Sequence, residues 1–451
     1  MAYAVSGWDI AIVLVLLYAV AVYLLYRRGW IGPAKSLTLF GPALMIKTQR
    51  GRGLLDRWGS RTRFWTVAAD LGIVLAAVAM VTIVVLLVLD AIVATRVPAS
   101  AAPTVQQALG IPGINPIIPI GYGLVALILG VVLHEVFHGI VARSQKIGVK
   151  SLGILWLVIP VGAFVEQDDA QMQAASRRKR DRVAAAGVLA NFALALAFFL
   201  VLSLVLTTGI QPNANGVGIG YVLPGTPAAN ASLAAGDIVT AVNGTPTPTN
   251  TALFDALASA RAGETVRVDY YSASANAPRS AQITLTSLEW YTHDPADATK
   301  GFLGISLAFL TPAELKTELS APVASPFGPL IGVTDWLVLP LAGLEPVAGT
   351  TAGFYHLTGV FAGMDPGTFW IGANLLYWLA WMNLLLGLSN ALPLFPLDGG
   401  LLFRDFAASV AARVKRGWDS ARLDRFAGRA AAAASLLVLF LLVWQFVAPR
   451  L

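Results

Sequence analysis

The amino-acid sequence predicts a polytopic α-helical membrane protein with about six transmembrane helices, a re-entrant β-hairpin and one inserted small α+β domain. Of the 451 residues, 57% are hydrophobic and only 12% are charged, whereas a soluble domain carries about 25% charged residues. Apolar runs of about 20 residues, the length that crosses a bilayer, recur along the chain. Between the fourth and fifth run, short alternating segments with Gly, Pro and Asn indicate a soluble insert.

The spanning helices are predicted where the sequence is continuously apolar. The runs lie at roughly 10–26, 64–93, 117–141, 183–206, 369–392 and 431–447. Two further apolar stretches are not expected to span, since 326–344 carries Asp335 with several Pro and Gly, and 152–165 contains Pro160 and Gly162. No basic residue precedes the first run, so it lacks the n-region of a signal peptide and is expected to be a retained anchor.

The basic residues gather in three stretches, 27–63, 143–182 and 401–430, which hold 24 of the 31 Lys and Arg but only eight acids. Their formal charge is +16, and the rest of the chain carries −10. The positive-inside rule places the three stretches in the cytoplasm and the poorly basic segments 96–117 and 208–368 outside. We therefore expect a cell-membrane protein with both termini outside. The net charge reports orientation, and no nucleic-acid partner is expected.

The third apolar run contains the sequence His134-Glu135-Val-Phe-His138, an H-E-x-x-H pattern on a helix. The two histidines are four residues apart, so both imidazoles lie on one face and can share a metal ion. Glu135 lies beside them, where a general base for attack by water must sit. Ionisable groups inside a membrane helix are costly, which favours a functional role over a His–Glu pair that only joins helices. The chain has no Cys, which excludes thiolate ligands and Cys nucleophiles.

Two histidines leave a zinc site incomplete, because catalytic zinc usually has three protein ligands. The acidic candidates downstream are Glu166, Asp168, Asp169 and Asp398. Asp398 ends the sequence Asn390-Ala-Leu-Pro-Leu-Phe-Pro-Leu-Asp398 and is followed by two Gly, so Pro and Gly break the helix there. A broken helix at membrane depth is tolerated where it lines a cavity or is buried in protein. Taken alone, Asp398 could equally be a plain helix-capping residue.

The soluble insert is expected from about 215 to 289. Its expected elements are strands at 266–271 and 280–286 and a helix at 251–260. Three of its sequences, Pro224-Gly-Thr-Pro-Ala-Ala229, Ala235-Gly-Asp-Ile238 and Val242-Asn-Gly244, resemble the PDZ domains attached to bacterial-type proteases. That resemblance implies a peptide ligand that adds a strand to a sheet edge. A generic small β domain is the alternative.

The two helix motifs together resemble those of the site-2 protease family of intramembrane zinc metalloproteases. The resemblance extends from about 117 to 400, includes the PDZ insert, and includes Gly187-Val-Leu-Ala-Asn191, which matches a G-x-x-x-N pattern of the family. The extra span before a basic loop resembles archaeal and eukaryotic-like members. The resemblance thus indicates a PDZ-containing member.

The family resemblance implies roles for individual residues. His134, His138 and Asp398 would bind one Zn2+ ion, and Glu135 would be the catalytic base. Asn191 and Asn390 match polar positions near the family's site, where each could bind substrate backbone or the oxyanion. An interhelical hydrogen bond is the alternative for both asparagines.

The implied function is that of an intramembrane zinc metalloendopeptidase. It would hydrolyse a peptide bond within or near the transmembrane segment of membrane-protein substrates, after a first extracytoplasmic cut. The loop 152–166, with Pro160 and Gly162, is expected to form a re-entrant hairpin that pairs with unwound substrate, as the family's membrane-embedded sheet implies. An ordinary interfacial loop is the alternative. The expected partners are transmembrane substrates, a peptide ligand of the PDZ domain and the lipid bilayer.

Two other functions stay open at this point. A catalytically silent scaffold of the same fold would bind peptides through the PDZ domain, although the intact H-E-x-x-H and Asp398 speak against it. A transporter that uses the polar intramembrane residues as a metal path would be expected to show internal repeats, and the sequence shows none.

Sidedness gives a test of the metal site that is independent of the family. His138 lies five residues before Arg143, and Asp398 directly precedes the third basic stretch, so both motifs approach the cytoplasmic side. A shared metal therefore requires an even number of crossings between residues 182 and 401. For this reason 326–344 is expected to lie at the outer surface or to re-enter.

The expected organisation has six parts. They are 1–116, the N-terminal anchor span, basic cytoplasmic loop and second span; 117–207, the first half of the catalytic core; 208–300, the extracytoplasmic PDZ domain; 301–368, a non-spanning connector; 369–400, the second half of the core; and 401–451, a basic cytoplasmic loop and C-terminal span.

Overall fold

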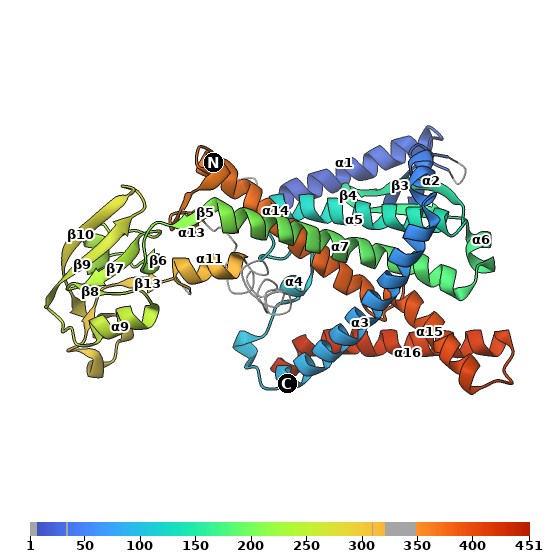
Figure 1. Ribbon diagram of the computed structural model, residues 1–451. Coiled ribbons are helices and arrows are strands. Elements are labelled where there is room, and N and C mark those ends of the chain that lie inside the picture. Colours follow the sequence, from blue (N-terminus) through green and yellow to red (C-terminus); the bar gives the residue numbers. More distant parts are fainter. Residues whose placement is uncertain (1–6, 33–34, 309, 321–348) are drawn as a thin grey trace. The chain divides into compact units, whose positions relative to one another are not determined.

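The computed structural model describes residues 7–32, 35–308, 310–320 and 349–451. The expectation about 326–344 lies outside the described residues. The chain divides into two compact units, one of Met1–Leu196 with Leu379–Leu451 and one of Ala197–Trp378. Figure 1 shows the helices and strands of both units.

A helix occupies each of the six predicted apolar runs. The helices are α1 (Gly7–Arg27), α3 (Thr62–Ala94), α5 (Ile120–Ser144), α7 (Arg177–Gly209), α14 (Pro366–Ala391) and α16 (Ser420–Val447). Among the described residues, five of these helices are long and apolar enough to cross a membrane, and the Ile12–Arg27 part of α1 is apolar but shorter. Helices suit this setting because they satisfy every backbone polar group internally.

Small residues bring the helices of the first unit close together. Ala69, Ala76 and Ala79 of α3 are buried, whereas the large residues Val67 and Val78 on its other faces are exposed. A Cβ at Gly72 would lie only 3.0 Å from the Cβ of Leu189 on α7. This is the pattern of membrane-helix contacts, where small residues let the backbones approach.

A four-stranded antiparallel sheet also belongs to the first unit. Its strands, in sheet order, are β1 (Leu37–Phe40), β2 (Ala43–Thr48), β3 (Val149–Leu157) and β4 (Ile159–Gln167). The hairpin expected at 152–166 is thus present as β3 and β4, and β4 runs beside α5 (Figure 1). The stretch 27–63, expected to be a loop, instead contains β1, β2 and helix α2 (Arg52–Gly59). The basic residues interspersed along that stretch conceal its strand pattern.

One tyrosine of α1 connects that helix to the sheet. The Tyr18 hydroxyl lies 2.7 Å from the carbonyl oxygen of Pro42 and 3.0 Å from that of Trp156, and it accepts a hydrogen bond of 3.0 Å from the N–H of Leu44. Backbone groups at the β1–β2 turn are thereby satisfied by a side chain from outside the sheet.

The second unit contains a sheet of six strands with the path β10-β9-β7-β6-β13, to which β8 is added beside β7. The strands are β6 (Val217–Val222), β7 (Ile238–Val242), β8 (Thr245–Pro246), β9 (Thr265–Ser272), β10 (Ala277–Thr284) and β13 (Ile305–Leu307). The expected strands at 266–271 and 280–286 correspond to β9 and to most of β10, and the expected helix corresponds to α9 (Asn250–Ala258). Because β13 pairs with β6, the sheet continues beyond the boundary expected at residue 300.

Shorter strands and α-helices lie between and after these elements. They are β5 (Ile210–Pro212), which pairs with β14 (Tyr355–Leu357), β11 (Thr286–Ser287), which pairs with β12 (Gly301–Phe302), and the helices α4 (Val105–Ala108), α6 (Asp169–Ala174), α8 (Pro227–Asn230), α10 (Glu289–Thr292), α11 (Pro312–Ser320), α13 (Gly349–Ala352) and α15 (Asp398–Val414). Helix α15 occupies part of the stretch 401–430 that was expected to be a loop.

The Gly-Asp-Ile sequence of the insert is a turn held by a buried carboxylate. Gly236 has a φ of 97°, a conformation that residues with a side chain rarely adopt. Asp237 is 1% exposed, and its carboxylate accepts hydrogen bonds of 2.9 Å from the N–H of Ala234 and 2.9 Å from the N–H of Ala273. The aspartate therefore fixes the entry into β7 to the segment after β9.

Replacing this carboxylate tests its role in the insert. Asp237→Ala leaves two amides without acceptors and should lower the free energy of unfolding of the insert by about 2–4 kcal/mol. The matched change Asp255→Ala, at an exposed residue of α9, should alter it by less than about 0.5 kcal/mol. Hydrogen exchange of β7 and β9 measures both effects, and equal protection in the two variants would contradict the assignment.

Candidate functional site

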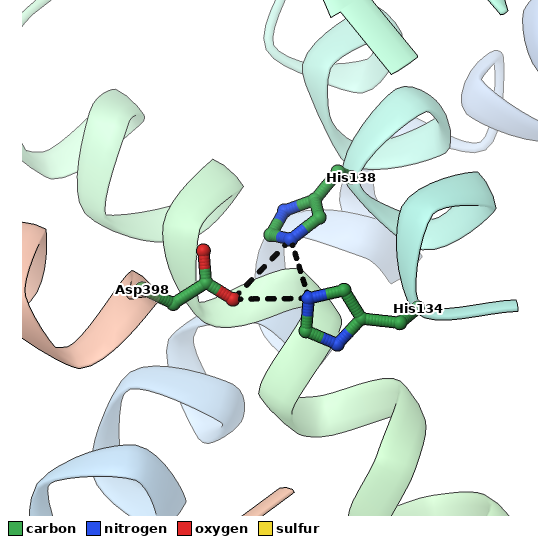
Figure 2. A group of neighbouring side chains, drawn as sticks. All are labelled: His134, His138 and Asp398. Carbon is green, nitrogen blue, oxygen red and sulfur yellow. Dashed lines mark hydrogen bonds and ion pairs between the residues drawn. The ribbon is translucent and has the colours of Figure 1, made fainter. Parts of the chain in front are cut away.

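The H-E-x-x-H sequence of α5 and the first residue of α15 meet in space. The Nε2 atoms of His134 and His138 lie 3.1 Å apart, and each lies 3.3 Å from Oδ2 of Asp398 (Figure 2). The two histidines are buried, at 7% and 6% exposure. The sequence patterns at 134–138 and 390–400 thus provide one cluster within the first unit.

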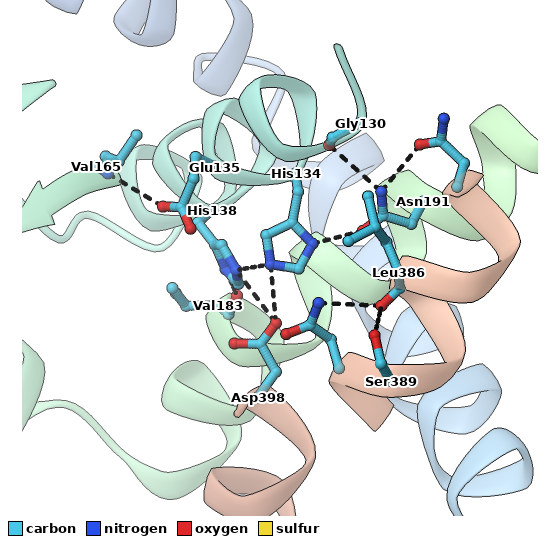
Figure 3. A network of polar contacts seen from close by, with 12 residues as sticks. Gly130, His134, Glu135, His138, Val165, Val183, Asn191, Leu386, Ser389 and Asp398 are labelled. Carbon is cyan, nitrogen blue, oxygen red and sulfur yellow. Dashed lines mark hydrogen bonds and ion pairs between the residues drawn. The ribbon is translucent and has the colours of Figure 1, made fainter. Parts of the chain in front are cut away.

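The outer nitrogen of each imidazole faces an acceptor. His138 Nδ1 lies 2.6 Å from the carbonyl oxygen of Val183, and His134 Nδ1 lies 2.6 Å from Oδ1 of Asn191 (Figure 3). A carbonyl oxygen can only accept, so the Nδ1 atoms carry the protons in the neutral rings. Both Nε2 atoms then present lone pairs to the centre of the cluster. Metal-binding histidines are held in this way in proteins.

The cluster has the dimensions of a zinc site. Ligands at 2.0–2.1 Å from a tetrahedral zinc are about 3.3 Å from one another, and the three edges measured here are 3.1, 3.3 and 3.3 Å. Apart from the two imidazole nitrogens, the buried Oδ2 of Asp398 has no hydrogen-bond partner among the described residues. Two imidazoles and a carboxylate are a common ligand set of catalytic zinc. His134, His138 and Asp398 could therefore hold a metal ion.

The absence of a side chain at Gly187 gives the two imidazoles the space they occupy. A Cβ at Gly187 of α7 would lie 2.3 Å from Cε1 and 2.4 Å from Nε2 of His134, and 2.5 Å from Nε2 of His138. Any larger residue would fill this space. The glycine of the G-x-x-x-N sequence is thus explained by the close passage of α7 over both imidazoles.

The break between α14 and α15 brings Asp398 to the histidines. Helix α14 ends at Ala391, and α15 begins at Asp398, as the Pro and Gly of this segment predict. A Cβ at Gly399 would lie 2.3 Å from the carbonyl oxygen of Ala391, and one at Gly400 would lie 2.8 Å from that of Leu394. Both glycines are required because α15 starts directly against the end of α14.

Glu135 lies next to the cluster at the wall of an open cleft. Its Oε2 accepts a hydrogen bond of 3.1 Å from the N–H of Val165 on β4 (Figure 3). The cleft has a volume of about 790 Å³ and is bordered by Glu135, His138 and Asp398. Charged residues of α7 and α15, among them Arg180 and Asp405, border its wider part. Water can therefore reach the carboxylate and the cluster.

The other acidic candidates lie elsewhere and have partners. Glu166 accepts hydrogen bonds of 2.5 Å from the Ser151 hydroxyl and 3.2 Å from Lys47, which hold the pKa of its carboxyl below the usual value. Asp168 accepts a hydrogen bond from the backbone of α6, and Asp169 pairs with a lysine at 3.3 Å. Asp398 is the acid that completes the cluster.

The remaining predicted residues differ in their relation to the cluster. The amide of Asn390 donates to the carbonyl oxygen of Leu386 in its own helix, at 3.0 Å. Asn191 is fully buried behind His134, and its bonds are of the interhelical kind. Gly162 and Pro160 pair with β3 residues within the hairpin. Asn383 of α14, which sequence reasoning missed, accepts a hydrogen bond of 2.9 Å from Asn191; its one signal was a polar residue in an apolar helix.

The model of peptidase family M50 matches residues 122–423. The chain belongs to peptidase family M50. This is the site-2 protease family of zinc metalloproteases, as the two helix motifs indicated. Peptidase family M50 is a metallopeptidase family, and several helices of this chain are apolar enough to cross a membrane.

Two further proteins resemble parts of this chain. The uncharacterized protein MJ0971 of Methanocaldococcus jannaschii is 43% identical over 88 residues, which are 19% of this chain and 24% of that protein. The match therefore spans about a quarter of that relative's length. The PDZ domain of an SdrC-like protein from Listeria monocytogenes is 26% identical, with 23% of this chain and 94% of that chain covered and a TM-score of 0.18.

The space at Gly187 can be tested directly. Gly187→Ala places a methyl group 2.4–2.5 Å from both Nε2 atoms, so the two imidazoles must shift and zinc affinity should fall by about 100-fold. Alanine favours the helix, so the fold should persist. The matched variant Gly121→Ala, in α5 with nothing within 4 Å of the new Cβ, should bind zinc as the wild type does. Competition with a metal chelator measures both, and equal affinities would contradict this geometry.

Proposed function

We propose that this M50 peptidase hydrolyses a peptide bond within or near the transmembrane segment of membrane-protein substrates. In this proposal His134, His138 and Asp398 hold one Zn2+ ion and Glu135 is the catalytic base. The observation that carries this proposal is that three possible ligand atoms, two imidazole nitrogens and one carboxylate oxygen, lie 3.1–3.3 Å from one another. The other nitrogen of each imidazole already has a hydrogen-bond partner. Two of these residues lie on a helix apolar enough to cross a membrane.

The chain's own residues supply the proton transfers. When bound, zinc is a Lewis acid that polarises the scissile carbonyl and makes water more acidic. Glu135 borders the cleft through which water enters, and it is adjacent to His134 in the sequence, so its carboxylate can take a proton from the attacking water. The same carboxyl can then protonate the leaving amine. The hydrogen bond from Val165 N–H holds one of its oxygens in place.

The edge of the sheet supports a way to hold the substrate. A transmembrane helix has its carbonyls bonded internally, so the scissile segment must unwind before attack. β4 is the last strand of the sheet, and the N–H of Val165 points away from β3 toward Glu135. The N–H of Ala163, two residues earlier, shares this direction. An unwound substrate segment that paired with β4 beyond Gly162 would therefore run toward the base.

In this proposal the insert lies outside the membrane and recognises the substrate. The positions of the basic stretches support a cytoplasmic cleft side of the first unit, with residues 208–368 and both termini outside. We assign the sheet around β6 and β7 as a PDZ domain, on the strength of its sequence motifs and its strand and helix content. It would bind a peptide and recognise the outer part of a substrate after a first cut, as in regulated intramembrane proteolysis.

Removal of the base separates catalysis from metal binding. Glu135→Gln should retain one zinc per chain and lose about 10²–10⁴-fold in the rate of substrate cleavage, because proton transfer is removed while the ligands stay. His134→Ala should lose both. Asp169→Asn, at the exposed acid paired with Lys150, should keep both. Cleavage of a transmembrane substrate in proteoliposomes and metal analysis give the two readings. Unchanged turnover in Glu135→Gln would favour the silent scaffold instead.

The proposed sidedness can be measured by labelling single cysteines, since the chain has no Cys of its own. Ala275→Cys lies in the exposed turn between β9 and β10, and Arg416→Cys lies in the exposed loop after α15. An impermeant maleimide added to intact cells should label residue 275 and not residue 416, and inverted vesicles should give the opposite result. Labelling of both residues from one side would contradict the proposed topology.

A further inference from the structure

Asn383 belongs to no motif of the sequence, yet it lies behind the metal cluster. It is fully buried on α14, and Asn191 is fully buried on α7. Leaving a carboxamide unpaired in an apolar interior is costly, so both side chains need defined partners. Their hydrogen bonds form one continuous chain that ends at His134.

The direction of every bond in this chain is fixed by backbone carbonyls. Asn383 Nδ2 donates to the carbonyl oxygen of Leu379 at 2.8 Å, so Asn383 Oδ1 must face Asn191 and accept. Asn191 Nδ2 donates to that oxygen at 2.9 Å and lies 3.4 Å from the carbonyl oxygen of Gly130. The oxygen of Asn191 is thereby turned toward His134 Nδ1, 2.6 Å away (Figure 3). Because carbonyl oxygens can only accept, the donor and the acceptor of each hydrogen bond in this series are fixed.

The two imidazoles differ in how they are held. His138 Nδ1 faces a backbone carbonyl, that of Val183, which cannot act as a donor. His134 Nδ1 faces a carboxamide, which can present either an oxygen or an NH₂ group. A reversed Asn191 would donate to His134 Nδ1 and leave the proton on Nε2, where the lone pair for a metal is required. His134 therefore needs a second group that prevents this reversal.

We propose that Asn383 is a positioning residue for the metal centre, because it fixes the orientation of Asn191 and so places the proton of His134 on Nδ1. This inference rests on the metal site proposed above. Close packing supports it, since a Cβ at Gly130 would lie 3.2 Å from Asn383 Oδ1 and 2.7 Å from a methyl carbon of Leu386. The glycine lets α14 approach α5 closely enough for the chain to form.

The position of the proton can be read directly in the metal-free, full-length protein. The chain has four histidines, and His293 and His356 are exposed, so labelling with ¹⁵N-histidine gives few and distinguishable signals. At a pH where the site rings are neutral, wild type should show protonated Nδ1 and bare Nε2 on both. Asn383→Leu should move His134 to a mixture of tautomers while His138 stays unchanged. The zinc dissociation constant should rise by about 10–100-fold.

Two further variants make the result specific. Asn383→Asp retains an oxygen that accepts from Asn191 and should restore the His134 tautomer. Ser389→Ala, which removes another hydrogen bond from a side chain of α14 to the carbonyl of Leu386, should leave both rings and zinc affinity as in wild type. The proposal is overturned if Asn383→Leu leaves His134 as in wild type, or if it changes both site rings equally. The tautomer is measured without metal. If the wild-type protein bound no zinc, that result would therefore refute the proposed function but not the effect of Asn383 on the His134 tautomer.

Discussion

The rest of the site depends on three lone-pair atoms being held within 3.1–3.3 Å of one another in an apolar interior. Bringing them together is unfavourable unless a cation compensates, so the surrounding helices must hold each group firmly. Helix α5 supplies both imidazoles from one face, because residues four apart lie one above the other. The broken α14–α15 junction supplies the carboxylate. Glycines at positions 187, 399 and 400 give the space that this convergence needs.

The polar groups around the cluster have two roles. Acceptors behind the rings, the Val183 carbonyl and Asn191, set the ring nitrogens so that both Nε2 atoms face inward. In front, Glu135 lies at the cleft wall and accepts a hydrogen bond from β4, so this carboxylate, the cleft and the outermost strand of the sheet meet at one place. For the proposed proteolysis in a membrane, this arrangement would link the two requirements, which are access for water and an unwound substrate.

Much of this organisation follows from the sequence, because it depends on local spacing. The four-residue interval of His134 and His138, the helix break before Asp398, and the hairpin around Pro160 and Gly162 are each encoded by neighbouring residues. Contacts between distant segments are not encoded in this way. Strands β1 and β2 join the hairpin across about 100 residues of sequence. The role of Asn383 can be inferred only from the packing of α5, α7 and α14, which brings Asn191 between Asn383 and His134.

In the proposed site two imidazoles and one carboxylate of this chain bind a zinc ion, and X-ray absorption at the zinc edge tests this binding most directly. Purified, active protein should contain one zinc per chain with two imidazole nitrogens and oxygen ligands at about 2.0–2.1 Å. In His138→Ala, the zinc spectrum should show one imidazole ligand fewer, or the protein should contain no zinc. A zinc bound without imidazole, or a spectrum unchanged by that substitution, would contradict the claim.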